Sequence, residues 1–140
     1  MEDIQIVEYS DKWEEEHLRF ARKYWKKKRR AIPEYIYWKF RGKADEQLPS
    51  LILAVKNNTV IGQIGLIPFD LTYKNKRIAA QWRCDLMVDK EYRGKNVAKK
   101  LYQVMEQNGR ISLSVNPSPV LHCGAHSHFP NARVIPDCLP

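Results

Sequence analysis

The chain has 140 residues, of which 44% are hydrophobic and 29% are charged. These values are ordinary for a globular protein, and they exclude a disordered tail, a fibrous repeat or room for a separate regulatory module. No apolar run approaches the roughly 18 residues needed to cross a bilayer, and the N-terminus lacks the pattern of a signal peptide. We therefore expect a single cytoplasmic domain over residues 1–140, without a membrane partner. Lys and Arg outnumber Asp and Glu by 24 to 16, which favours an anionic partner.

The first part of the chain predicts a strand followed by two helices. Residues 4–9 are a short β-like run, and Asp11 with Glu14 matches a capping box that begins a helix. The apolar residues of this helix recur at helical spacing and would form one stripe: Trp13, His17, Phe20, Ala21 and Tyr24. Pro33 is well placed to open a second helix, and Gly42 offers its end.

The middle of the chain predicts three antiparallel strands. Apolar runs over 51–55 and 60–67 flank the turn candidate Asn57–Asn58. A second reversal at 74–76 then allows 77–88 to run back as a long strand.

After these strands comes a polar loop over 89–96 and the clearest helix of the sequence. Its apolar residues again recur at helical spacing: Val97, Leu101, Val104 and Met105. Asn108 and Gly109 provide a stop. Residues 111–115 alternate as a half-buried strand does. The tail over 116–140 has no clear periodicity and carries three of the four histidines.

The loop before that helix has the features of a phosphate site. A loop that leads from a strand into a helix presents unpaired backbone N–H groups and the positive end of the helix dipole. Arg93 and Lys95 add positive charge, Gly94 allows a tight turn or a close approach, and Ala98 keeps the first helical turn slim. The alternative is a basic loop that merely caps a surface helix.

The stretch from Cys84 to Leu101 reads CDLMVDKEYRGKNVAKKL and resembles the acetyl-CoA motif of the GNAT N-acetyltransferase superfamily. That motif is Arg or Gln, two residues, Gly, one residue, then Gly or Ala. Asn96 stands at the usual Gly position, and Asn tolerates left-handed backbone better than other non-glycine residues. The order of predicted elements over 4–115 follows the family as well. The resemblance implies an α/β fold with a mixed, mostly antiparallel central sheet flanked by helices.

The resemblance also implies acetyl-CoA as the cofactor, without a metal. The strand before the loop would pair with the pantetheine arm, the loop amides would hold the pyrophosphate, and the 111–115 strand would splay away to leave a cleft. The residues implied in cofactor binding are Met87, Val88, Arg93, Gly94, Lys95, Asn96, Val97, Ala98 and Asn116.

In the implied reaction an amine attacks the thioester directly. An alkyl ammonium with a pKa of about 10.4 is less than roughly 1% deprotonated at neutral pH, so a general base is useful. Asp85 is the candidate base and Glu91 the second candidate. The alternative for Asp85 is a buried structural carboxylate paired with Arg83 or Arg77. Cys123 falls near the place of the Tyr general acid of the family.

By the same analogy, Tyr35, Trp38 and Trp82 would line a site for a small amine or a protein amine. Residues 116–140 fit the family pattern poorly, and the region is a degenerate version, a truncation, or a sheet completed by a second subunit in a homodimer. The predicted function is therefore N-acetyl transfer. The alternative is a non-catalytic acyl-CoA or protein-binding module.

Two further patterns are compatible with a metal site and with nucleic-acid binding, but we favour simpler structural explanations for both. Zinc-ligand residue types gather in the tail, where incidental surface residues are the simpler interpretation: His122, Cys123, His126, His128 and Cys138. The basic run over 26–30 beside Tyr35 is compatible with single-stranded nucleic acid, but a solvated helix end next to core aromatics explains it as well.

Overall fold

The strands of the central sheet lie side by side in chain order in the computed structural model, which describes residues 3–25, 32–41 and 50–114. Within these residues the sheet has five strands: β1 (Gln5–Glu8), β2 (Leu51–Lys56), β3 (Thr59–Tyr73), β4 (Lys76–Val88) and β5 (Ile111–Leu113). The pairs β1–β2, β2–β3 and β3–β4 are antiparallel, and β5 runs parallel to β4. The predicted α/β fold with a mostly antiparallel sheet is confirmed.

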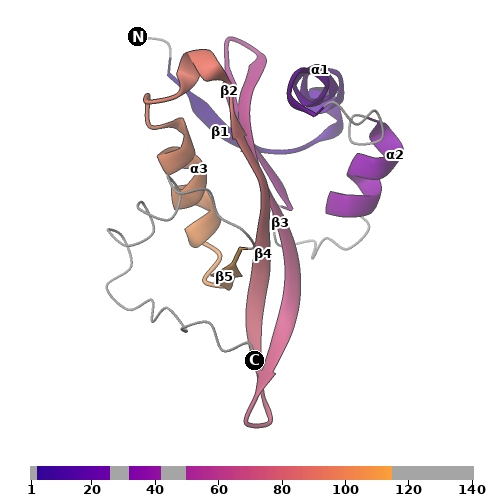
Figure 1. Cartoon of the computed structure of the whole chain (residues 1–140), viewed down its shortest axis with the longest axis vertical. Coiled ribbons are helices and arrows are strands. Elements are labelled where there is room, and N and C mark those ends of the chain that lie inside the picture. Colours follow the sequence, from indigo (N-terminus) through magenta and orange to yellow (C-terminus); the bar gives the residue numbers. More distant parts are fainter. Residues whose placement is uncertain (1–2, 26–31, 42–49, 115–140) are drawn as a thin grey trace, which may run out of the picture.

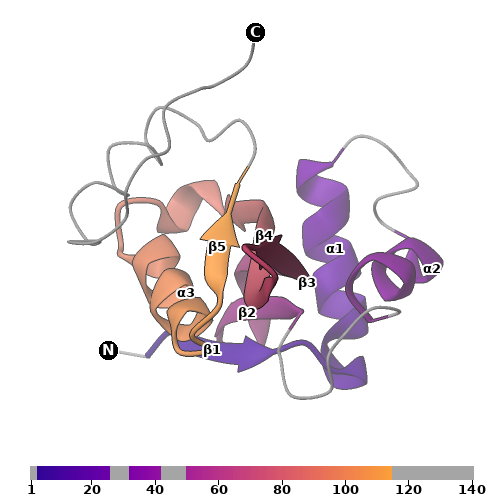
Figure 2. The same ribbon diagram turned by 90° about the horizontal axis from the view of Figure 1, so that it is seen from below.

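Helices cover both faces of this sheet. The described helical elements are η1 (Asp11–Trp13), α1 (Glu14–Tyr24), α2 (Pro33–Ile36), the π-helix η3 (Tyr37–Arg41), η4 (Lys90–Tyr92) and α3 (Val97–Glu106). The two views agree that α1 and α2 lie on one face and α3 on the other (Figures 1 and 2).

The α1 stripe packs on the sheet as predicted. Phe20 and Ala21 are each 1% exposed, and His17 is equally buried. The predicted capping box is wrong, because Asp11 lies inside a 3₁₀ turn that precedes α1. The backbone closes this turn by itself through the Trp13 N–H, which donates to the Ser10 carbonyl at 2.9 Å.

The second helical segment is fixed to β3 by close packing. Pro33 opens α2 as predicted, and the chain continues as η3, whose Phe40 is 3% exposed. A Cβ at Gly65 would lie 2.4 Å from Cε1 of Phe40, so only a glycine in β3 leaves space for this ring. Gly42, the predicted end of the helix, lies outside the described residues.

The β3–β4 hairpin extends well past the rest of the sheet (Figure 1). The pairing of β2 with β3 ends at Gly65, whereas β3 and β4 stay paired as far as Tyr73 and Lys76. Pro68 lies in this projecting part of β3, where its missing N–H costs no ladder bond to β2.

On the opposite face, α3 buries its predicted stripe. Val97, Leu101 and Met105 are each at most 1% exposed. The strand expected over 111–115 is shorter, and the half-buried alternation is wrong at its start, because Ile111 is 48% exposed. The described part of β5 pairs with β4 only at Ala80–Trp82, so it lies at the margin of the sheet.

Candidate functional site

A β-bulge interrupts β4 in the middle of the sheet. Gln63 pairs with Met87 and Gly65 with Cys84, so that two residues of β4 lie opposite the single residue between them in β3. One of the two is Asp85, whose φ of 51° is left-handed and uncommon for a non-glycine residue. The bulge leaves a residue of β4 outside the ladder and bends the strand.

Next to the bulge, one edge of β4 is open within the described part of the chain. The described part of β5 pairs with β4 only as far as Trp82, so over residues 83–88 the described structure has no strand on that side. Strand backbone with an open edge can pair with an extended ligand. Met87 and Val88, predicted to bind pantetheine, lie on this segment.

Beyond β4, the chain enters α3 through two left-handed residues. Gly94 has a φ of 77°, and Asn96 has φ 61° and ψ 15°, the conformation expected for a residue at a Gly position. The first helical bond runs from the Lys100 N–H to the Asn96 carbonyl at 3.0 Å. The N–H groups of Val97 and Ala98 therefore precede the hydrogen-bonded part of the helix.

This helix start fits an anionic group. Asn96 makes no side-chain cap, and the first turn has no acidic residue. A Cβ at Gly94 would meet no atom within 4 Å, so the space beside the loop is open. The Lys95 amine lies 5.1 Å from the ring centroid of Tyr92. Free amides, the helix dipole and nearby cations together favour a phosphate-like ligand.

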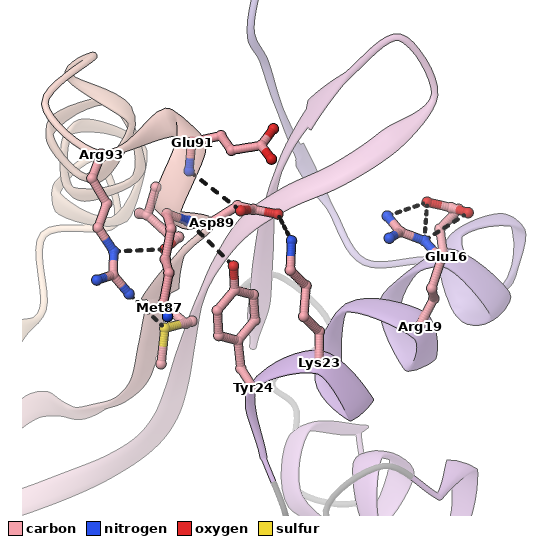
Figure 3. A network of polar contacts seen from close by, with 10 residues as sticks. Glu16, Arg19, Lys23, Tyr24, Met87, Asp89, Glu91 and Arg93 are labelled. Carbon is pink, nitrogen blue, oxygen red and sulfur yellow. Dashed lines mark hydrogen bonds and ion pairs between the residues drawn. The ribbon is translucent and has the colours of Figure 1, made fainter.

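The loop is tied to α1 by a polar network at Asp89 (Figure 3). Asp89 accepts from the Lys23 amine at 2.7 Å and from the Glu91 N–H at 3.4 Å, while the Lys90 N–H donates to the Tyr24 hydroxyl at 3.2 Å. Burial alone would raise the pKa of Asp89, but the hydrogen bonds from Lys23 and Tyr24 outweigh it and lower this pKa. These contacts fix the position of the loop relative to α1.

Arg93 is an exposed residue whose side chain lies along the end of β4. Its Nε donates to the Val88 carbonyl at 3.1 Å, and its Nη2 lies 3.7 Å from the Met87 sulfur (Figure 3). The guanidinium is thus held between the open strand edge and the loop. Glu91, the second candidate base, lies in η4 with an exposed side chain.

On the other face of the sheet, a pocket ends at the bulge. It is small, with a cavity volume of about 10 Å³, and is partly open to solvent; its lining residues are His17, Ala21, Trp25, Tyr35, Ile36, Phe40, Gln63 and Asp85. The Gln63 amide donates to the Asp85 carbonyl at 3.2 Å, and its oxygen lies 2.7 Å from His17 Nε2. Gln63 therefore accepts from His17, and the chain of bonds holds the backbone of the bulge.

His17 is the buried imidazole in this set of hydrogen bonds. Burial lowers the pKa of His17, and this effect exceeds the opposing hydrogen bond to Gln63. With its proton on Nε2, the ring keeps a lone pair on Nδ1, for which the described residues offer no hydrogen-bond partner. The pocket thus includes a buried ring nitrogen that has no hydrogen-bond partner among the described residues.

Asp85 is ion-paired, but with a residue that the sequence did not indicate. The amine of Lys39 in η3 lies 2.6 Å from its Oδ2, and the two side chains are 14% and 19% exposed. Burial lowers the pKa of Lys39, but the hydrogen bond to Asp85 outweighs this and raises it. Burial also raises the pKa of the neighbouring Cys84 to about 11.

The arginines expected to pair with Asp85 are engaged elsewhere, so that prediction is wrong. Arg77 pairs with Asp70 near the hairpin tip. Arg83 donates to the Ser114 hydroxyl at 3.3 Å and lies 5.4 Å from the Tyr102 ring centroid. The bulge explains this outcome, because regular alternation would put Arg83 and Asp85 on one face, whereas Arg83 faces the α3 side and the bulge directs Asp85 to the α2 side.

The structure places the predicted aromatic residues at different locations. Tyr35 lines the pocket. The ring centroid of Trp38 lies 5.8 Å from that of Tyr35, and Trp38 is 65% exposed. Trp82 stacks on Phe69 at 5.5 Å further along the hairpin. Neither tryptophan is among the residues that line the pocket.

Several predicted residues lie outside the described part of the chain, namely Asn116, Cys123, the other zinc-ligand candidates of the tail and the basic run over 26–30. Within the described residues, no group of three metal-ligating side chains is present. None of the described helices is long and apolar enough to span a membrane.

Sequence reasoning missed three residues that contact one another or Asp85 around the bulge. His17 was the one polar member of an apolar helical stripe, and Gln63 the one polar residue within an apolar strand, so each carried a signal. Nothing in the sequence marked Lys39.

The model of a family described as an acetyltransferase (GNAT) domain matches residues 5–113. No curated protein matches the sequence.

Solved structures share the fold. One is an acetyltransferase of the GNAT family from Staphylococcus aureus, with 24% identity, a TM-score of 0.54, and coverage of 76% of this chain and 66% of that one. A GNAT family N-acetyltransferase from Escherichia coli in complex with CoA has 18% identity and a TM-score of 0.65 over 90% and 72% of the two chains. A glucosamine-6-phosphate N-acetyltransferase from Arabidopsis thaliana has 10% identity and a TM-score of 0.66 over 95% of both.

Proposed function

Because the chain belongs to the GNAT acetyltransferase family, we propose that it binds acetyl-CoA and transfers the acetyl group to a primary amine. The observation that carries this proposal is the loop that leads into α3. Its left-handed Gly94 and Asn96, its free helix-start amides and the open space beside Gly94 form a site for a diphosphate at the end of an open strand edge.

The open edge of β4 would bind the extended part of the ligand. Backbone groups near Met87 pair with the pantetheine arm, and the Arg93 guanidinium supplies positive charge where the strand gives way to the loop. An arm that starts at the loop and follows β4 leads to the bulge at Asp85. Such an arm would bring the acetyl group beside the pocket of the opposite face.

At the bulge, Asp85 would act as the general base. Bound acetyl-CoA supplies the acetyl group as a thioester. Asp85 accepts a proton from the incoming ammonium, and Gln63 and His17 keep the bulge in place through the Asp85 carbonyl. A positioned base contributes typically 10²–10⁴-fold. Lys39 must give up its ion pair before a separate amine reaches this carboxylate.

Isothermal calorimetry with acetyl-CoA tests the binding step. Arg93→Ala removes a charged hydrogen-bond donor near the diphosphate, which is worth about 1.5–3 kcal/mol, and should weaken binding by about 10- to 100-fold. Gly94→Trp fills the open space and should weaken it as well. Lys74→Ala, at the exposed hairpin turn, is the control. Unchanged affinity in both loop variants removes the loop from the site.

Release of CoA thiol with a panel of small amines and lysine peptides tests the transfer step. Asp85→Asn should lower turnover by about 10²-fold or more if Asp85 is the base. Glu91→Gln should leave it unchanged, and the reverse result would assign the role to Glu91.

A second candidate function is a binding module without turnover. The Lys39–Asp85 ion pair favours it, because it occupies the carboxylate in the described structure. Tight acetyl-CoA binding with no thiol release from any amine would support this second function. The small or protein amine acceptor and a homodimer remain proposals that the amine panel and a sedimentation measurement test.

A further inference from the structure

The amine of Lys39 is held at the centre of the proposed active site. It belongs to η3, which packs on β3 through Phe40, and it reaches across to the bulge of β4. Its Nζ lies 2.6 Å from Asp85 Oδ2, and 5.3 and 5.8 Å from the ring centroids of Phe40 and Tyr35. A carboxylate and two aromatic faces fix the position of this amine.

We propose that Lys39 is an acetyl acceptor, so that the chain acetylates its own side chain from acetyl-CoA. The inference rests on the proposed function, since that function sets the thioester at the bulge. Intramolecular placement replaces the binding of a separate amine, and well-oriented groups of this kind react at high effective concentration.

The reaction balances without a further reactant. Lys39 begins as an ammonium, and one proton passes from Nζ to the Asp85 carboxylate. The Nζ lone pair then forms a bond with the acetyl carbonyl carbon, and the carbon–sulfur bond breaks. The second proton leaves Nζ for the departing thiolate, giving CoA thiol and a neutral amide. Asp85 returns its proton to water.

Acetylation would change the site that performs it. The amide at Lys39 carries no positive charge, so the ion pair with Asp85 is lost and the carboxylate becomes available to other amines. One acetyl group per chain would therefore enter in a fast phase, before any turnover with a separate acceptor.

The low solvent exposure of Lys39 distinguishes the proposed self-acetylation from non-specific chemical acetylation. The Lys39 side chain is 14% exposed, whereas Lys74 and Lys76 lie exposed near the hairpin tip. A small reagent such as acetic anhydride modifies exposed amines first, so it should modify Lys74 and Lys76 before Lys39. With acetyl-CoA the order should be reversed.

The experiment follows acetylation of the full chain by intact mass and peptide mapping, with acetyl-CoA and with acetic anhydride in parallel. Lys39→Arg keeps a cation at the site and should abolish the fast incorporation of one acetyl group. Lys12→Arg is the matched control, because Lys12 also lies over a ring, 5.0 Å from the Trp13 centroid, but at the surface. Asp85→Asn should slow modification of Lys39 by about 10²-fold or more. Circular dichroism verifies that each variant is folded.

The same order of modification with both reagents overturns the inference. So does absence of acetyl-Lys39 from a chain that binds acetyl-CoA by calorimetry and acetylates amines of the panel. In that result the proposed function stands and the self-acetylation fails. A chain that does not bind acetyl-CoA overturns both.

Discussion

Replacement of Gln63 by Leu tests the hydrogen-bond chain beneath the bulge. Gln63 is 2% exposed, and it links His17 Nε2 at 2.7 Å to the Asp85 carbonyl at 3.2 Å. Leucine has a similar volume but no polar atom, so the buried His17 N–H and the Asp85 carbonyl both lose a partner. Each buried group left in this way costs about 1–3 kcal/mol. The Asp85 carbonyl lies in a partly exposed residue, so we expect a total loss of about 2–4 kcal/mol in the free energy of unfolding.

Urea unfolding followed by tryptophan fluorescence measures this loss, which corresponds to a fall in Tm of about 6–12 °C for a domain of this size. Gln103→Leu, on the exposed face of α3, is the control and should change stability by less than about 0.5 kcal/mol. Because His17 and Gln63 are in contact, the double variant with His17→Leu should cost at least about 1 kcal/mol less than the sum of the two single variants. A loss below about 1 kcal/mol for Gln63→Leu, or simple additivity, would refute the reasoning.

Three further predictions concern residues around the same bulge. Gly65→Ala places a Cβ 2.4 Å from Cε1 of Phe40 and should lower the free energy of unfolding by about 1–3 kcal/mol, and an unchanged urea midpoint would contradict the packing. Burial lowers the pKa of His17 below 6.5, so the unfolded state binds more protons there; stability should be complete above pH 6.5 and fall as the pH decreases through the folded pKa. His17→Leu should flatten this part of the pH profile of urea unfolding, and an unaltered profile would assign it to other groups. With its pKa raised from 9.0 to about 11, Cys84 should react with iodoacetamide at neutral pH about 100-fold more slowly in the folded chain than in urea, and equal rates in peptide mapping would rule out its burial.

The elements that the sequence predicted are those with a local cause. The α3 stripe of Val97, Leu101 and Met105 follows from helical spacing, and the Asn57–Asn58 turn follows from the tolerance of Asn for positive φ, here 50° and 56°. The start of α3 was predictable for the same reason, since Asn96 and the residues around it determine the backbone conformation without help from distant segments.

The contacts around the pocket and the bulge join residues that lie far apart in the sequence. His17 meets Gln63, and Lys39 meets Asp85, each across 46 positions of the chain. Such pairs depend on how the α1–α2 segment packs on the sheet, which no short pattern specifies. The bulge itself follows from the register between β3 and β4 rather than from a glycine or proline, so Asp85 was identified as a candidate while its partner was assigned wrongly.

The connections between strands also determine the order in which the sheet can assemble. The turns from β2 to β3 and from β3 to β4 have two residues each, whereas β5 reaches β4 only through the crossover that contains α3. Closing a short turn costs less chain entropy than closing a long crossover, so local pairs form first during folding. We expect the β2–β3 and β3–β4 hairpins to form first, and the pairing of β1 with β2 and of β5 with β4, each across a long connection, to follow. The segments that flank β4 on its far side, α3 and β5, would then settle onto a hairpin that is already paired.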